Sequence, residues 1–282
     1  MIEMLSSPLM QRALIVALLV GLAAPVVGTY LVQRRLTLLG DGIGHIALTG
    51  VALGWLAGSI AGVTNKDAWA VPGAIIAAVV GALLIEWMRD HGHTSGDVAL
   101  ALLFYGGIAG GVLLIGIAGG TTSNLNSYLF GSISTVTKTD AWLTVILAIV
   151  VLAIGLGLRP ALFTLCHDEE FARASGLPTK LLSVLISVTA ALTVAVAMRV
   201  VGALMVSALM VVPVAVSQIV ARSFRATMIS AMAIGAIVSV TGLVITFFNP
   251  WSPGATIVLL AVGLYALTAI THPILERVWY RK

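Results

Sequence analysis

Long apolar runs separated by short polar breaks cover almost the whole chain, and they constrain its fold more than any other feature. Only 9% of the residues are charged and the mean hydropathy is +1.10, whereas roughly 25% of a soluble domain is charged. A helix that crosses a bilayer needs about 20 mostly apolar residues. We therefore predict an all-α integral membrane protein with one transmembrane domain over residues 1–282 and no room for a soluble catalytic domain.

The apolar runs predict nine transmembrane helices. They lie at 10–32, 43–63, 69–86, 98–118, 141–158, 181–198, 202–221, 226–248 and 255–272. The weakest boundary separates the sixth helix from the seventh, because only Arg199 and Gly202 interrupt the apolar sequence there.

The basic residues support a turn at this boundary. With nine spans, most of the 15 lysines and arginines fall on one side of the membrane, namely Arg34, Arg35, Arg89, Arg159, Arg173, Lys180, Arg222, Arg225, Arg277, Arg281 and Lys282. Joining the two helices would leave Arg199 in lipid and remove this bias. Because basic loops face the cytoplasm, we predict an outside N-terminus and a cytoplasmic C-terminus. The net charge of +4 reflects this loop bias, so nucleic acid is not an expected partner.

Two connections are long enough to hold structure. In the outer one, 119–140, residues 124–133 predict a short helix. In the inner one, 159–180, Asp168 is a plausible helix N-cap and Gly176 a plausible stop, so we expect a two-turn cytoplasmic helix between them.

Asp41 and His45 form the sharpest candidate site. They stand four residues apart, on one face of a helix, in a glycine-rich segment at mid-membrane depth. A carboxylate and an imidazole suit zinc, manganese or ferrous iron. Alternatively, Asp41 caps the helix and His45 bonds a neighbouring carbonyl. One pair cannot complete a tetrahedral site, so a metal-binding role implies weak transit binding or a second copy across a symmetric dimer. No other span interior is expected to hold a carboxylate.

The seventh predicted helix combines Gly202, Ser207 and Pro213. Proline removes a helical hydrogen bond and small residues allow close packing, as a moving gate requires. Ordinary packing of a polytopic protein is the alternative. None of the four lysines follows a glycine, so there is no Walker A loop for ATP. We expect no enzymatic activity, and any energy source lies on another subunit.

Four sequence blocks resemble the membrane permease subunits of bacterial ATP-driven importers for zinc and manganese, closest to the zinc (ZnuB) type of the zinc/manganese/iron permease family. They are "VGTYLVQRRLTLLGDGIGHIALTGVALG" from Val27, "LNSYLFGSI" from Leu125, "DEEFARASGLP" from Asp168 and "MRVVGALMVSALMVVPVAVSQIVARS" from Met198. They follow the family's order and spacing.

The resemblance implies a multi-pass protein of the bacterial cytoplasmic (inner) membrane. It implies a homodimer around a central path, two ATP-binding cassette ATPase subunits beneath it and an extracytoplasmic metal-binding protein above it. No cofactor is bound permanently, and the transported metal is expected to be zinc. The family's pore site resembles Asp41 and His45, and its gate helix is similar to the one bearing Gly202, Ser207 and Pro213.

The resemblance also identifies the inner connection as the segment that couples the permease to the ATPase. Its residues are Asp168, Glu169, Glu170, Phe171, Ala172 and Gly176. We expect Phe171 and Ala172 to present an apolar face to the ATPase and the acidic residues to set its orientation.

Two alternatives stay open. The same architecture serves manganese or ferrous iron, because Asp with His binds all three ions. From another class, the chain could be a self-sufficient ion-coupled carrier or a channel.

Overall fold

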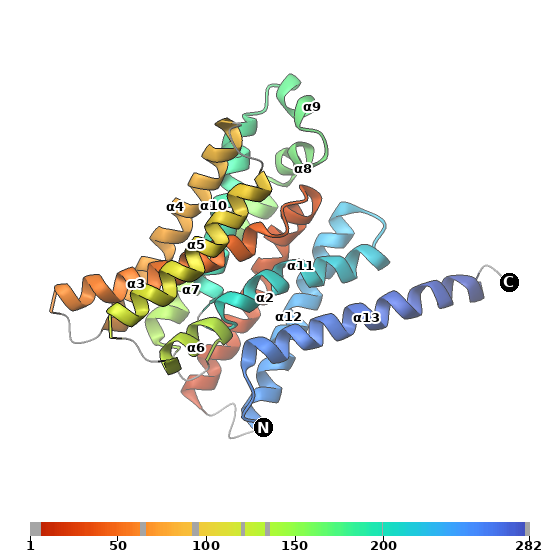
Figure 1. The fold of residues 1–282 in the computed structure, drawn as a ribbon. Helices are drawn as coiled ribbons and strands as arrows, with labels where there is room; N and C mark the ends of the chain where they lie inside the picture. The colour runs from red at the N-terminus through yellow and green to blue at the C-terminus, as the bar shows by residue number, and fades with distance from the viewer. Residues whose placement is uncertain are drawn as a thin grey trace.

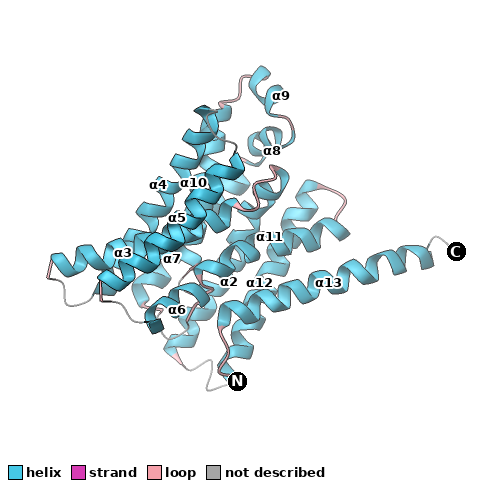
Figure 2. Cartoon of the chain, viewed as in Figure 1, coloured by secondary structure: helices cyan, strands magenta, loops and turns pink. Residues whose placement is uncertain are grey.

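The computed structural model describes residues 7–62, 66–91, 96–119, 122–132, 136–198 and 200–279, and all regular structure in these ranges is helical (Figure 2). The helices are α2 (Pro8–Gln33), α3 (Leu39–Ile60), the 3-10 turn η1 (Lys66–Trp69), α4 (Ala70–His91), α5 (Gly96–Ile117), α6 (Thr122–Phe130), α7 (Lys138–Gly157), α8 (Arg159–His167), α9 (Glu169–Ala174), α10 (Thr179–Ala197), α11 (Ala203–Val220), α12 (Phe224–Phe248) and α13 (Pro253–Trp279). The predicted all-α membrane fold is confirmed.

Eight of the described helices are long and apolar enough to cross a bilayer, and α11 is a shorter apolar helix. The predicted break between the sixth and seventh helices is present, because α10 ends at Ala197 and α11 begins at Ala203. Arg199, on which that prediction depended, lies outside the described residues. The count of nine spans stays a prediction.

Helix α2 occupies the middle of the bundle and contacts α7, α10, α11 and α12. Small residues permit this close packing. A Cβ atom at Gly21 would lie 2.6 Å from the carbonyl oxygen of Gly235 in α12, and Gly28 lies directly against the backbone of Met210 in α11. The outer helices α5, α7 and α13 bury much less of their surface within the chain.

The connections gather at two opposite ends of the bundle. Figure 1 places α6 and the starts of α2 and α13 at the lower end, and α8 with α9 at the upper end. At the lower end, the Ser252 hydroxyl donates to the Phe130 carbonyl oxygen over 2.8 Å. At the upper end, Phe163 of α8 packs against Phe224 at the start of α12, with ring centroids 4.8 Å apart.

The predicted short helices in both long connections are present, with one addition. Helix α6 occupies most of the outer segment expected at 124–133, of which Ile133 lies outside the described residues. In the inner connection α9 is preceded by α8, a second helix that was not predicted. Its start at Arg159–Pro160 places a proline in the first helical turn, where the missing N–H costs nothing.

The turn between α10 and α11 depends on Gly202. Its φ of 92° lies in the left-handed region, and a Cβ atom there would lie 2.6 Å from the backbone nitrogen of Gly131. Gly176 has a similar φ of 79°, but a Cβ atom there would meet nothing within 4 Å. A substitution at Gly176 therefore introduces backbone strain alone, whereas a substitution at Gly202 introduces strain and a steric clash.

We predict that Gly202→Ala destabilises the folded protein much more than Gly176→Ala. The Gly176 variant pays only for the positive φ, roughly 1 kcal/mol, whereas the Gly202 variant must also displace the backbone after α6. Thermal unfolding of both variants in detergent measures the difference. Equal melting temperatures would contradict this account of the α10–α11 turn.

Candidate functional site

Asp41 and His45 lie on consecutive turns of α3, near its beginning. The Ser207 hydroxyl of α11 donates a short hydrogen bond to the Asp41 carboxylate oxygen Oδ1. Asp41 does not cap the helix, because the N-cap residue is Leu38 and no side chain caps α3. The capping alternative is therefore wrong, and the second carboxylate oxygen of Asp41 is left for another partner.

His45 is 3% exposed and is held between two helices. The Phe104 ring of α5 meets it edge to face, with centroids 4.4 Å apart. On that side a Cβ atom at Gly107 would lie 2.7 Å from the His45 carbonyl carbon, and on the other side a Cβ atom at Gly44 would lie 3.0 Å from the Ala203 oxygen of α11. Gly107 of α5 and Gly44 of α3 thus let α5 and α11 pack closely against the two sides of α3 at His45.

The buried Nδ1 atom of His45 has no hydrogen-bond partner. A buried polar atom without a partner costs roughly 1–3 kcal/mol, so such atoms are rare in folded proteins unless they serve a ligand. The alternative in which His45 bonds a carbonyl finds no support at this nitrogen. A free imidazole nitrogen one turn from a carboxylate is the donor set expected of a metal site.

A cavity of about 310 Å³ lies beside Asp41. It is lined by Leu38, Asp41, Leu100, Ala101, Phe104 and Tyr105, so one wall of the cavity carries the Asp41 carboxylate and the others are apolar. Within the described residues no cluster of three or more His, Cys, Asp or Glu side chains could hold a metal ion. Within the described part of one chain, this region therefore offers only two candidate ligands, Asp41 and His45.

The three residues predicted for the gate helix fall in different places. Ser207 contacts the candidate site through Asp41. Pro213 lies inside α11, where its carbonyl oxygen accepts a 2.8 Å hydrogen bond from Ser217. Gly202 precedes α11 and packs against the end of α6. The helix thus joins the site to the lower end of the bundle.

The inner connection has the predicted N-cap and stop. Asp168 accepts a 2.9 Å hydrogen bond from the Phe171 backbone at the start of α9. After α9, the N–H of Leu177 bonds the Ala172 oxygen and the N–H of Gly176 bonds the Arg173 oxygen, as in a Schellman motif. Phe171 is 61% exposed, as expected, but Ala172 is 0% exposed. The prediction that both face outward is wrong, because on this short helix Ala172 points into the protein.

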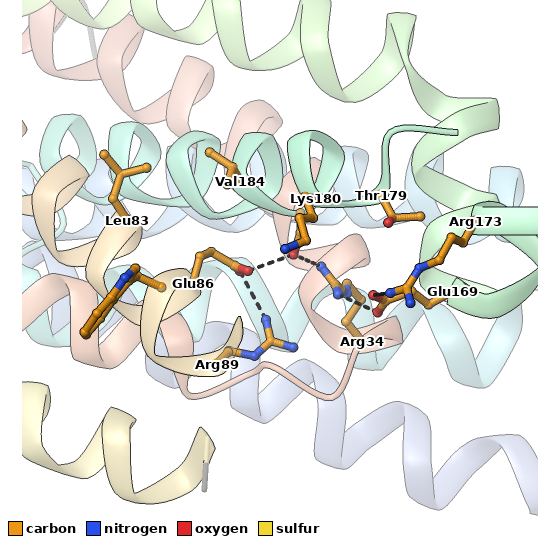
Figure 3. A pocket seen from close by; sticks show the side chains of 11 residues that line it. Arg34, Leu83, Glu86, Arg89, Glu169, Arg173, Thr179, Lys180 and Val184 are labelled. Carbon is orange, nitrogen blue, oxygen red and sulfur yellow. Dashed lines mark hydrogen bonds and ion pairs between the residues drawn. The ribbon is translucent and has the colours of Figure 1, made fainter. Parts of the chain in front are cut away.

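Polar contacts tie α9 to three long helices (Figure 3). Glu169 pairs with Arg34, the C-cap residue of α2, at 3.3 Å. Arg34 also donates to the Ser183 hydroxyl of α10 over 2.6 Å, and that hydroxyl donates to Glu86 of α4 over 2.9 Å. Helix α9 is therefore connected to the end of α2, to α10 and to α4 by one hydrogen-bonded chain.

Glu86 was missed by sequence reasoning, which expected no further carboxylate inside a span. It lies in α4, is 8% exposed and accepts hydrogen bonds from Ser183, from Ser187 over 2.6 Å and from Arg89 over 3.1 Å. These three donors satisfy the hydrogen-bonding capacity of a buried carboxylate. One sequence feature could have indicated a buried polar partner for Glu86. Ser183 and Ser187 stand four residues apart on one face of α10.

Cys166, the only cysteine of the chain, lies near the end of α8. Its thiol approaches the Tyr30 carbonyl oxygen at 3.8 Å. Burial raises the pKa of the Cys166 thiol to about 11, although the nearby Arg34 charge lowers it in part. The cysteine is therefore a poor nucleophile at neutral pH.

Comparisons with known proteins agree with this architecture. Residues 6–272 match the model of the ABC 3 transport family. The chain is 30% identical to the manganese transport system membrane protein MntC of Halalkalibacterium halodurans, over 99% of this chain and 94% of that protein. It is 31% identical to the manganese import system permease protein ScaB of Streptococcus parasanguinis, over 94% and 91%. Among solved structures, PsaBC from Streptococcus pneumoniae matches with a TM-score of 0.82 and 29% identity, covering 95% of both chains.

We predict that maleimide modifies Cys166 slowly at neutral pH and that the rate of modification rises with pH. The thiolate reacts, so with a pKa of about 11 the rate should rise about tenfold per pH unit from about pH 7 to 10. A Ser175→Cys variant on a Cys166→Ser background is the control, because position 175 is exposed. Its rate should level off near pH 9, at an ordinary cysteine pKa of about 8.5. Parallel profiles would contradict the raised pKa.

Proposed function

The chain belongs to the ABC 3 transport family, and from this premise we propose that it is the permease subunit of an ATP-driven importer that carries manganese. The family and its solved relative establish a membrane permease of the ABC metal importers. The metal, the dimer and the roles of individual residues are our proposals.

The incomplete donor set at α3 carries the proposal. Asp41 borders an open cavity, and His45 places an unpartnered Nδ1 one turn away. Two symmetry-related copies of this pair would supply two carboxylates and two imidazoles around one ion. The proposed assembly is therefore a homodimer in which each copy contributes Asp41 and His45 to a shared transit site.

Manganese is preferred to zinc on the strength of the relatives. MntC and ScaB are both named for manganese, and neither supports the zinc expected from the sequence. The donor set accepts either ion, since carboxylates suit manganese and imidazoles suit zinc and ferrous iron. Zinc and iron remain the competitors that a transport measurement must include.

The position of Ser207 suits a transit site. Its hydroxyl occupies one oxygen of the Asp41 carboxylate, which holds the side chain in place and leaves the other oxygen for the ion. The helices pack closely around this bond, since a Cβ atom at Gly40 would lie 3.2 Å from the Ser207 Cβ atom. We propose that a shift of α11 along α3 moves the Asp41 carboxylate and so changes its affinity for the metal ion.

We predict that Asp41→Ala and His45→Ala each reduce metal uptake at least about a hundredfold, while the variants still insert and fold. Ser207→Ala should reduce uptake less, because it removes a positioning hydrogen bond and no ligand. Uptake of radiolabelled manganese into vesicles holding the permease, its ATPase and its binding protein measures this, with zinc and iron as competitors.

Normal uptake by both ligand variants would overturn the site, and uptake of zinc alone would overturn manganese. Vesicles that lack the ATPase are the control for mechanism. Uptake that persists in them would favour the carrier or channel alternative over an ATP-driven importer.

The inner connection is proposed to seat against the ATPase through Phe171. Its ring is exposed at the upper end of the bundle while α9 is anchored from below by Glu169 and Arg34. An exposed aromatic residue on an anchored helix is suited to fill a pocket on a partner. The lower end, with α6, is then left for the extracytoplasmic binding protein.

We predict that Phe171→Asp separates the ATPase from the permease, whereas Phe171→Leu retains most of the interaction. A charge in a desolvated pocket is costly, while leucine keeps the apolar contact. Co-purification of the ATPase and metal-stimulated hydrolysis are the measurements. If Phe171→Asp leaves both unchanged, the ring has no coupling role.

The basic end of the bundle is proposed to face the cytoplasm. Arg34, Arg89 and Arg173 lie together there, and basic segments are retained on the cytoplasmic side. An odd number of spans, with α11 counted, then places the N-terminus outside and the C-terminus inside.

We predict that an impermeant thiol reagent on intact cells modifies Thr139→Cys but not Ser175→Cys, each made on a Cys166→Ser background. Both positions are exposed in the structure, so the side of the membrane on which each one lies should decide whether the reagent reaches it. Permeabilised cells are the control, in which both should react. Labelling of position 175 from outside would reverse the proposed orientation.

A further inference from the structure

A polar hollow of about 370 Å³ opens at the α8–α9 end, between α2, α4, α9 and α10 (Figure 3). Among the described residues, four basic and two acidic side chains line it, together with polar and apolar residues. The lining consists of Arg34, Leu83, Glu86, Trp87, Arg89, Glu169, Arg173, Thr179, Lys180, Ser183 and Val184. The hollow therefore carries an excess of positive charge in a chain that has few charges.

The two carboxylates do not neutralise the hollow. Glu86 is held by two serine hydroxyls and by Arg89, and Glu169 is shared between Arg34 and Arg173. The Arg34 side chain is only 7% exposed, so its charge is fixed in the floor. Guanidinium groups keep several N–H donors beyond those used here. Three arginines therefore face two carboxylates in the described lining, and the floor presents fixed donors and a net positive charge.

The rim on the α4 side is apolar and faces outward. Leu83 is 44% exposed and Trp87, one turn further along α4, is 59% exposed. Tryptophan is enriched where a membrane protein meets the lipid headgroups. A basic floor beside an apolar, outward-facing rim matches the two parts of a phospholipid, its anionic headgroup and its acyl chains.

We propose that this hollow binds the phosphate group of an anionic phospholipid. Arg89 and Lys180 would meet the phosphate at the mouth, Arg34 would attract it from the floor, and the acyl chains would run past Trp87 and Leu83. Basic pockets between helices on the cytoplasmic side suit such headgroups. Free phosphate shares the headgroup chemistry but makes no use of the apolar rim.

The site has a consequence for the inner connection. Arg173 belongs to α9 and lines the same hollow as Arg89 of α4. A bound phosphate would bridge cations on these two helices through charge-assisted hydrogen bonds. The lipid would therefore add a link between the membrane helices and α9, beside the existing Arg34–Glu169 pair.

Native mass spectrometry of the full-length permease in detergent tests the proposal, with phosphatidylglycerol and phosphatidylcholine as probes. The wild type should bind its first phosphatidylglycerol at least about tenfold more tightly than phosphatidylcholine, and Arg89→Gln/Lys180→Gln should lose roughly that factor. Arg225→Gln is the matched control, because this exposed arginine lies at the same end but outside the hollow. It should bind as the wild type does.

Three results would overturn the proposal. The double variant could keep its preference, Arg225→Gln could lose it equally, or inorganic phosphate alone could displace the lipid and bind with the same dependence on Arg89 and Lys180. The first two exclude the site and the third replaces the lipid with a free anion. If the double variant does not fold, Lys180→Gln alone decides, with an expected loss of about threefold.

Discussion

A polar group inside a bilayer must find its partner within the protein, and this requirement organises the bundle. Hydrocarbon offers no hydrogen bonds, so unsatisfied groups are costly. Threonine hydroxyls bond carbonyls of their own helix, as Thr29 does with Pro25. Glu86 recruits donors from α10 and from its own helix, and Asp41 recruits Ser207 from α11. These bonds link α4 to α10 and α3 to α11, so the packing of each pair must keep the two partners within hydrogen-bond distance.

Much of the fold could be predicted because hydropathy and local spacing act within one segment. The helical runs, the break between α10 and α11, the Asp168 cap and the Gly176 stop depend on residues a few positions apart. The pairing of Asp41 and His45 on one helix face is a local feature of the same kind. Such features need no knowledge of what lies across the bundle.

The features that were missed depend on contacts between distant segments. Ala172 and Phe171 are neighbours in sequence, yet only the packing of α9 on the long helices decides which one is buried. In a membrane protein the lipid-facing and core-facing sides of a helix are both apolar. Hydropathy therefore could not identify which face of α4 carries its ion pair, and Glu86 looked like the polar end of a span. The bond between Ser207 and Asp41 joins residues 166 positions apart.

The buried polar atoms that have no hydrogen-bond partner are informative about transport. Among the described residues, the buried side-chain atoms without a partner are His45 Nδ1 and Ser239 Oγ, and of these His45 stands one turn from a carboxylate. A site completed within one chain would hold its ion whatever its neighbours did. In the proposed dimer each copy supplies half of the ligands, so the affinity depends on how closely the two α3 helices approach. Motion that separates them would weaken the site and release the ion, and the cost of the unpartnered imidazole would be regained each time an ion enters.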